Sequence, residues 1–228
     1  VYTAVKTAKE KLGASSNHAA VFWPKGAVGE KIYCLSAMAA AETAATDAAN
    51  GDVPYESPSN KDLKITATVL DDGTEVALDQ EQANLLNGQG VITAINANGF
   101  KLWGNNTAAY PSTTDPKDRW LAVRRFFDWD GNNFILTYFQ KVDKPGNKRL
   151  IQSIVDSQNI IGNGYVARDY CAGYRLEFHA EENPITDLLD GKLTTHTYLA
   201  PYIPAEKIVN IREYDTAALE AALTGGGE

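Results

Sequence analysis

Histidine and cysteine, two residue types that carry much of enzyme and metal chemistry, are scarce in this sequence. It holds three histidines and two cysteines in 228 residues. Cys34 and Cys171 lie far apart, in neither a CxxC pattern nor a metal-ligand spacing. We expect both to be buried free thiols, with a disulfide as the alternative. The sequence also lacks a Gly-x-Ser-x-Gly motif, which excludes the nucleophile elbow of α/β-hydrolases.

Long apolar runs and an excess of positive charge are missing too. No run approaches the roughly 18–20 apolar residues of a membrane span, and no signal peptide opens the chain. The formal charge of −8 argues against a nucleic-acid or anionic-membrane surface, because phosphate binding depends on clustered Lys and Arg. With 44% hydrophobic residues, the chain can bury a core in one large domain or two modest ones. Because residue 1 is Val, we expect further sequence upstream.

The first part of the chain alternates helix and strand patterns. Helical patterns cover 2–12, 34–49 and 81–86, and strand patterns cover 18–23, 63–69 and 90–95. Pro24-Lys-Gly26 is expected to end the first strand. This alternation indicates α/β organisation for residues 1–96. Asn96-Ala-Asn-Gly99 is the predicted joint to a second domain.

Two longer helical patterns follow, over 118–142 and 147–161. Lys144-Pro145-Gly146 lies between them and predicts an antiparallel pair, because Pro and Gly end one helix and reverse the chain. Gly162-Asn-Gly164 is interpreted as the terminator of the second helix, since it is too short for a phosphate cradle. Alternating strands over 174–180 and 193–199 then flank a short helix that begins at Asn183-Pro184 and runs through Leu189.

The last stretch differs in kind from the rest. Pro201 and Pro204 hold the chain extended, residues 207–214 offer one more strand, and a helix is expected over 216–223. Such a strand either folds back onto its own sheet or reaches the sheet edge of a neighbour.

Candidate metal chemistry is confined to one place. Glu177, His179 and Glu181 alternate along a strand, and His196 on the next strand could face them. The spacing matches no specific metal-site signature, and polar residues are expected on the solvent side of a half-buried strand. Asp128-Trp-Asp130-Gly131-Asn132 resembles a calcium loop, but its Gly comes two positions early and the distal Glu is missing.

Two further patterns have ordinary structural explanations and indicate no functional site. Arg124 and Arg125 lie inside a helix among aromatic residues, which favours ion pairing with Asp or Glu over substrate binding. Asn105-Asn-Thr107 is a glycosylation triplet without a secretion signal. The sequence therefore predicts no catalytic residue, no metal ligand and no cofactor-binding residue.

A longer set of motifs resembles the contractile phage tail sheath proteins. Upstream, Ser57-Pro-Ser-Asn60 and Glu81-Gln-Ala-Asn-Leu-Leu86 resemble the end of that family's central domain. The segments that resemble its C-terminal domain are Gly99-Phe-Lys-Leu-Trp-Gly-Asn-Asn-Thr107, Trp120-Leu-Ala-Val-Arg-Arg125, Phe134-Ile-Leu-Thr-Tyr138, Gly162-Asn-Gly-Tyr165 and Asn183-Pro184.

The resemblance implies an α+β fold in three parts. Residues 1–98 would be the end of an α/β central domain. Residues 99–200 would be a C-terminal sheath domain with a long helix pair and a small mixed sheet. Residues 201–228 would be an extended arm. The self-assembly residues of that arm would be Lys207, Ile208, Val209, Asn210, Ile211, Arg212, Glu213 and Tyr214.

The implied function is structural, with no enzyme activity. Sheath subunits stack as six-fold rings in a helix around a tail tube and contract to drive that tube through the bacterial envelope. The expected partners are other sheath subunits, the tube protein, the baseplate and the tail terminator. Neither direct binding of nucleic acid nor insertion of the protein into a membrane is expected. The protein would reside in the virion tail after assembly in the host cytoplasm. Alternatives are the sheath of a phage-derived injection particle, a closed-ring tail protein, and a tail-associated cell-wall hydrolase.

Overall fold

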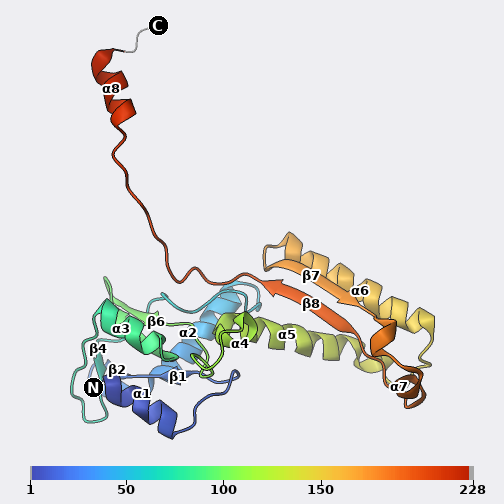
Figure 1. The fold of residues 1–228 in the computed structure, drawn as a ribbon. Coiled ribbons are helices and arrows are strands. Elements are labelled where there is room, and N and C mark those ends of the chain that lie inside the picture. The colour runs from blue at the N-terminus through green and yellow to red at the C-terminus, as the bar shows by residue number, and fades with distance from the viewer. Residues whose placement is uncertain (1, 226–228) are drawn as a thin grey trace.

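The computed structural model describes residues 2–225, which form two modules and a protruding arm (Figure 1). The helices are α1 (Tyr2–Lys11), α2 (Leu35–Ala49), α3 (Gln80–Asn87), α4 (Pro116–Arg119), α5 (Leu121–Tyr138), α6 (Lys148–Ala167), α7 (Ile185–Leu189) and α8 (Thr216–Thr224). The strands are β1 (Val21–Phe22), β2 (Lys25–Val28), β3 (Lys31–Tyr33), β4 (Ala67–Val69), β5 (Val91–Asn96), β6 (Phe100–Trp103), β7 (Cys171–Glu177) and β8 (His196–Pro201). The mixture of helices with small sheets confirms the α+β class.

The first module, residues 2–120, is built around strand β5. Parallel pairing with β1 and antiparallel pairing with β6 give the order β1-β5-β6. Residues 91–95 of β5 are all buried, as expected for a central strand covered on both faces. Leu35 and Ala39 of α2 pack with Ile92 and Leu102 in one apolar cluster. The helix–strand alternation therefore buries a core as predicted.

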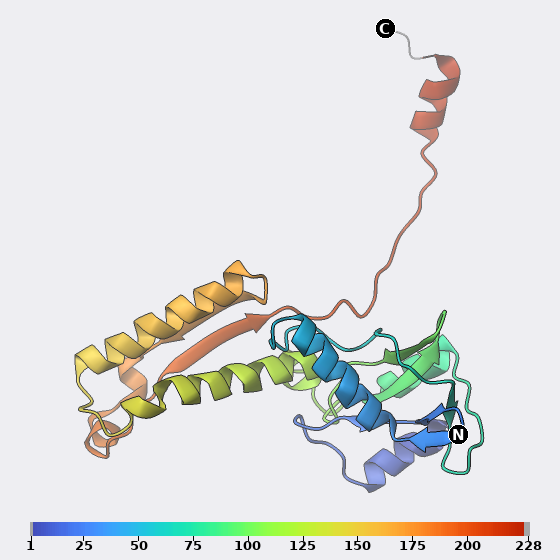
Figure 2. The same ribbon diagram turned by 180° about the vertical axis from the view of Figure 1, so that it is seen from behind.

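The second module, residues 121–201, consists of helices α5 and α6 and the antiparallel hairpin of β7 and β8. Helix α5 leads out of the first module, and α6 returns alongside it (Figure 2). The two helices meet through aromatic side chains, since the Tyr165 ring lies 6.2 Å from Phe126 and 5.3 Å from Trp129 between centroids. The predicted antiparallel pair is present, and its apolar cluster includes Cys171 and Tyr174 of β7.

The interpretation of Gly162-Asn-Gly164 as a helix terminator is wrong. Helix α6 continues through both glycines to Ala167. Glycine inside a helix costs only about 1 kcal/mol relative to alanine, and at Gly162 it leaves room for the ring of Tyr174. Tertiary packing therefore decides where this helix ends.

The structure corrects several element boundaries. Strand β1 ends at Phe22, before Pro24-Lys-Gly26, as predicted, but Lys25 begins β2, which forms with β3 and β4 a second small sheet that the sequence did not indicate. The helix predicted over 118–142 breaks at Trp120, whose extended backbone forms a bridge with Asn106. Of the strand predicted over 63–69, only Ala67–Val69 forms strand β4, and strands β7 and β8 are shifted along the chain by a few residues from their predicted positions.

The cysteines differ from each other. Cys171 is buried as predicted, but Cys34 is exposed, and neither forms a disulfide. Cys34 is the residue before α2, whose buried side chains Leu35, Ala39 and Thr46 lie on another face. Within residues 2–225, no helix is both long and apolar enough to cross a membrane.

Candidate self-assembly surfaces

The arm, residues 202–225, leaves the second module at the end of β8 and extends away from both modules (Figures 1 and 2). Residues 202–215 form neither helix nor strand, and α8 follows. The Asp215 side chain caps α8 by accepting a hydrogen bond from the Ala218 N–H at 2.9 Å. The arm therefore does not fold back onto its own sheet in this structure.

The arm carries apolar side chains that this chain does not cover. Ile208 is 87% exposed and Ile211 is 80% exposed. The other large apolar side chains exposed along the arm are Tyr202, Ile203, Val209, Tyr214, Leu219 and Leu223. Each would gain roughly 1.5–3 kcal/mol on full burial, so the arm has the character of a segment that packs against a partner.

The root of the arm is held to the first module by Arg119. Its guanidinium pairs with Glu206 at 2.9 Å and donates from Nε to the Asn106 side chain at 3.0 Å. The same group lies 4.4 Å from the ring centroid of Tyr110 and 4.1 Å from that of Trp120. Stacking between two rings fixes the guanidinium, so the arm starts in a defined direction.

The two outer edges of the β7–β8 hairpin differ. On β7, the Asn159 side chain of α6 accepts from the Leu176 N–H at 2.8 Å and donates to the Leu176 carbonyl at 3.0 Å. The backbone N–H and carbonyl of Leu176 therefore point away from β8. Those of its register partner Thr197 must point away from β7. By the same alternation, the backbone N–H and carbonyl of Leu199 point outward. The backbone of Pro201 also faces outward, and proline has no N–H to leave unpaired.

The outer edge of β8 is thus the open one. Among the hydrogen bonds of residues 2–225, none satisfies the Thr197 or Leu199 N–H. An open strand edge can pair with a strand from another chain. This edge and the uncovered arm are the two halves of a candidate self-assembly interface.

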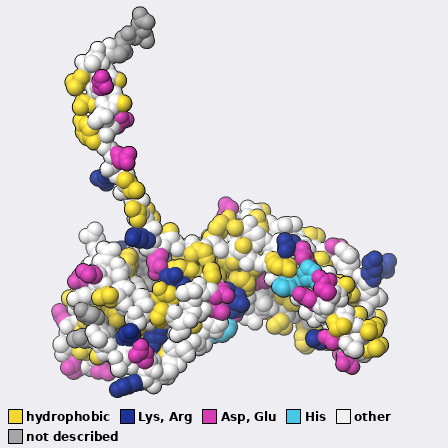
Figure 3. All heavy atoms as spheres, in the orientation of Figure 1, with side chains coloured by type: hydrophobic (Ala, Val, Ile, Leu, Met, Phe, Trp, Pro, Cys, Tyr) yellow, Lys and Arg dark blue, Asp and Glu magenta, His cyan; other side chains and the backbone are white. Residues whose placement is uncertain are grey.

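The predicted metal candidates do come together on the solvent face of the hairpin. His179 lies 3.1 Å from Glu177 and 3.8 Å from Glu181, and the rings of His179 and His196 are 5.9 Å apart between centroids. Figure 3 shows histidine side chains beside acidic ones on the second module. However, His196 turns to Glu182 and stacks on Tyr198. In the described part of the chain, no group of three or more His, Cys, Asp or Glu side chains is arranged to hold a metal ion.

A buried polar network lies under the hairpin. The Tyr174 hydroxyl donates to Asp130 Oδ2 at 3.2 Å and accepts from Gln158 Nε2 at 2.6 Å. Burial raises the pKa of Asp130 to about 6, against a smaller opposing effect of the Tyr174 hydrogen bond. Asp130 Oδ1 has no hydrogen-bond partner within the described residues. The residues of the calcium-like pattern therefore lie inside α5, where Asp130 links that helix to the hairpin.

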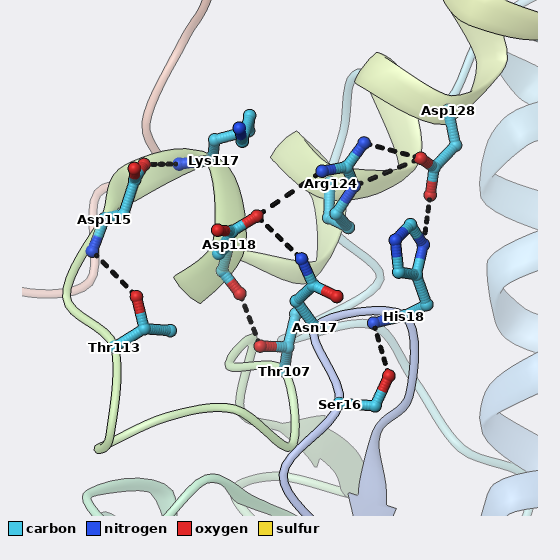
Figure 4. A network of polar contacts seen from close by, with 10 residues as sticks. All are labelled: Ser16, Asn17, His18, Thr107, Thr113, Asp115, Lys117, Asp118, Arg124 and Asp128. Atoms are coloured by element: carbon cyan, nitrogen blue, oxygen red, sulfur yellow. Dashed lines mark hydrogen bonds and ion pairs between the residues drawn. The ribbon is translucent and has the colours of Figure 1, made fainter.

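Ion pairs join α5 to the first module, as predicted for the two arginines. Arg125 pairs with Asp47 of α2. Arg124 contacts Asp128 at 2.6 Å and Asp118 at 3.4 Å (Figure 4). Asn17 donates to Asp118 at 2.8 Å, and this bond, with the nearby Lys117 and Arg124, holds the pKa of Asp118 below its ordinary value. These contacts fix the direction in which the second module leaves the first.

The sequence did not indicate Arg119 or Asn159 as important, and it indicated Asp130 only as part of the calcium-like pattern. Arg119 follows a polar helix turn, and Asn159 is one polar residue on a mixed helix face. Only Asp130 carried a signal, because a carboxylate among Phe126, Trp129 and Phe134 is unusual on an apolar helix face. Residues 207–214, predicted as a self-assembly strand, are exposed and unpaired in this chain.

Comparison with known proteins assigns the class. No family model matches the chain. It is 32% identical over 204 residues to the tail sheath protein of Burkholderia phage BcepMu, covering 86% of this chain and 41% of that protein. It is also 32% identical over 149 residues to the tail sheath protein of Escherichia phage P2, covering 63% of this chain and 35% of that protein. The chain thus spans less than half the length of these curated relatives.

Solved structures agree in fold. One match is the sheath complex of the extracellular contractile injection system PVC in its contracted state. The match covers 96% of this chain and 62% of the PVC sheath chain, with a TM-score of 0.79 at 20% identity. The baseplate of the anti-feeding prophage matches 89% of this chain and 56% of its own with a TM-score of 0.77 at 21% identity. The fold is that of contractile sheath proteins. With the sequence relatives, it confirms the predicted membership of the tail sheath family.

Proposed function

We propose that this chain is a structural subunit of a contractile phage tail sheath and that it works through self-association, without catalysing a reaction. The observation that carries the proposal is that one chain has both an uncovered apolar arm and an open strand edge. Relatives named as tail sheath proteins, from phages BcepMu and P2, support the same function.

The proposed division of labour follows the chain. Residues 1–98 end a central domain, residues 99–200 form the C-terminal sheath domain, and residues 201–228 are the linking arm. Two separate apolar clusters support a division into two units, although the first includes Leu102 from beyond residue 98 and the second includes Val53 from before it. The strand Lys207–Tyr214 of one subunit adds to the β8 edge of its neighbour.

Strand addition suits a sleeve that contracts. Each backbone hydrogen bond contributes about 0.5–1.5 kcal/mol net, and the arm adds burial of its apolar side chains. Such a link can persist while the modules rotate past one another on weaker side-chain contacts. Because the arm and the edge are different surfaces, the contact is head-to-tail and can repeat around a helix of stacked six-fold rings.

The proposal extends to partners and place. The subunits assemble in the host cytoplasm around the tube protein, between a baseplate and a tail terminator, and remain in the virion. The likeness to an anti-feeding prophage baseplate structure supports the baseplate contact. The likeness to the PVC sheath leaves the sheath of a phage-derived injection particle as the second candidate, which electron microscopy of native particles for a genome-filled head would distinguish.

Removal of the arm tests the proposal. A variant of the complete sheath protein without residues 202–228 should remain folded by circular dichroism yet form no tubes by electron microscopy. Ile208→Ser together with Ile211→Ser is the matched milder variant, since it keeps the length of the arm and removes two exposed apolar side chains. Tubes of normal length and number from the shortened variant would refute the linking role of the arm.

A further inference from the structure

Helix α8, at the end of the arm, is apolar and acidic. Its sequence Thr-Ala-Ala-Leu-Glu-Ala-Ala-Leu-Thr presents Leu219 and Leu223 one turn apart, 43% and 76% exposed. Residues 213–225 include Glu213, Asp215 and Glu220 and no Lys or Arg. A nine-residue helix is marginal alone in water, so packing against a partner is needed to hold it.

A segment with exposed apolar side chains and the opposite charge lies at the far end of the second module. The tip segment, defined as residues 136–149, connects α5 to α6 through the short 3-10 helix Phe139–Lys141. Its exposed apolar side chains are Leu136, Phe139 and Val142, with Phe139 73% exposed. It also carries four basic residues, Lys141, Lys144, Lys148 and Arg149, against the single acid Asp143.

These basic side chains are available for a partner. Within residues 2–225, none of the four forms a salt bridge. Figure 3 shows Lys and Arg side chains at this end of the molecule together with hydrophobic side chains and with Asp and Glu. The tip segment therefore offers α8 an exposed apolar surface and the opposite charge.

The tip segment lies where β8 begins. A Cβ placed on Gly146 would lie 3.7 Å from Leu193, three residues before β8, and β8 runs from there back toward the root of the arm (Figure 1). The eight residues from 207 to 214 span roughly 26 Å at about 3.3 Å per residue, enough to cover the 6 residues of β8. A strand laid antiparallel along β8 therefore delivers α8 to the tip segment, whereas a parallel strand delivers it to the opposite end.

We propose that α8 of one copy docks on the tip segment of the copy whose β8 edge receives its arm, and that the arm strand runs antiparallel to β8. The proposal rests on the proposed sheath function. It adds the direction of the strand and a second, mixed apolar and ionic contact that locks the end of the arm.

Thiol crosslinking in assembled sheaths tests the proposal. The complete protein carries Cys34→Ser, which removes the exposed native thiol, and one of three cysteine pairs. Lys144→Cys with Glu220→Cys probes the tip segment. Ala172→Cys with Glu220→Cys probes the opposite end of the hairpin. Tyr198→Cys with Asn210→Cys probes the middle of β8, which meets the middle of the arm strand in either direction.

We expect crosslinked ladders between copies from the 144–220 and 198–210 pairs and none from the 172–220 pair. A 198–210 ladder without a 144–220 ladder would overturn the docking of α8 and leave strand addition intact. The absence of all three ladders would remove the proposed linking role of the arm as well.

Charge reversal provides a second measurement. Lys144→Glu with Lys148→Glu should lower the salt concentration at which sheaths dissociate, and adding Glu220→Lys should restore part of it. Lys64→Glu, an exposed reversal in the first module, is the control and should cause no shift. Equal shifts from the control and the tip variant would contradict an ionic contact at the tip.

Discussion

The ring of Tyr174 in β7 lies against the backbone of Gly162 in α6. A Cβ built on Gly162 would overlap the ring at Cδ1, Cγ and Cε1, so no other residue fits there without movement. This contact brings the Tyr174 hydroxyl to Asp130 and Gln158. One glycine thus allows the hairpin to sit close on both long helices.

Gly162→Ala should destabilise the protein by about 1–3 kcal/mol, the usual cost of overpacking a well-packed core. The measurement is the free energy of unfolding from chemical denaturation. Gly164→Ala is a matched control two residues away in the same helix, where a Cβ would meet nothing within 4 Å. That variant should be more stable than wild type by roughly 0.5–1 kcal/mol, since alanine favours the helix. Similar effects at both positions would contradict the packing role of Gly162.

The two glycines also show what sequence could and could not predict. Periodicity located the long helices and most strands, because burial of one face makes apolar residues recur at regular spacing in the sequence. It could not locate the end of α6, because Gly162 is explained only by Tyr174, which lies on another element. The β2–β3 hairpin was missed for a related reason, since Pro24-Lys-Gly26 has turn chemistry yet Gly26 and Ala27 pair on both sides within a sheet.

The candidate interface divides in the same way. The arm was predictable, because Pro201, Pro204 and a strand pattern with Val209 and Ile211 on one face all lie in one segment. The open edge of β8 was not, because it depends on Asn159 closing the edge of β7 from a distant helix. The ion pairs of Arg124 and Arg125 were expected in kind, but their partners Asp118 and Asp47 could not be named from the sequence.

The stability of the protein should depend on Asp130 at mildly acidic pH. The folded-state pKa of Asp130, about 6, lies above its ordinary value of 3.8, because burial disfavours the charged form. The folded state therefore holds the proton more tightly than the unfolded state. The contribution of Asp130 to stability is greatest below pH 3.8 and is lost as the pH rises to about 6.

Asp130→Asn isolates that contribution, because asparagine keeps the shape and does not titrate. Free energies of unfolding measured between pH 4 and pH 7, the range that brackets the shifted pKa of about 6, should fall less steeply for the variant than for wild type. Parallel profiles for the two proteins would show that Asp130 titrates in the folded state as it does in the unfolded chain.

The two cysteines should react at very different rates. Cys34 is exposed, whereas Cys171 is buried, and burial raises the pKa of the Cys171 thiol. A maleimide should therefore modify one thiol in the native protein and two in denaturant, counted by mass spectrometry. Cys34→Ser should abolish the native reaction. Rapid native labelling of that variant would place Cys171 at the surface.

Thr197→Pro should block assembly while the single subunit stays folded. The Thr197 N–H points away from β7, so its loss removes no hydrogen bond within the hairpin, and proline is tolerated at such an edge position. An incoming strand would meet the ring of proline instead of a donor. Thr197→Val is the matched control, since valine keeps the N–H and the branched shape, and it should assemble like wild type. Unfolding measurements and electron microscopy of the assembled sheath together decide the outcome. If the proline variant formed normal tubes, the neighbour's strand would have to bind elsewhere than the β8 edge.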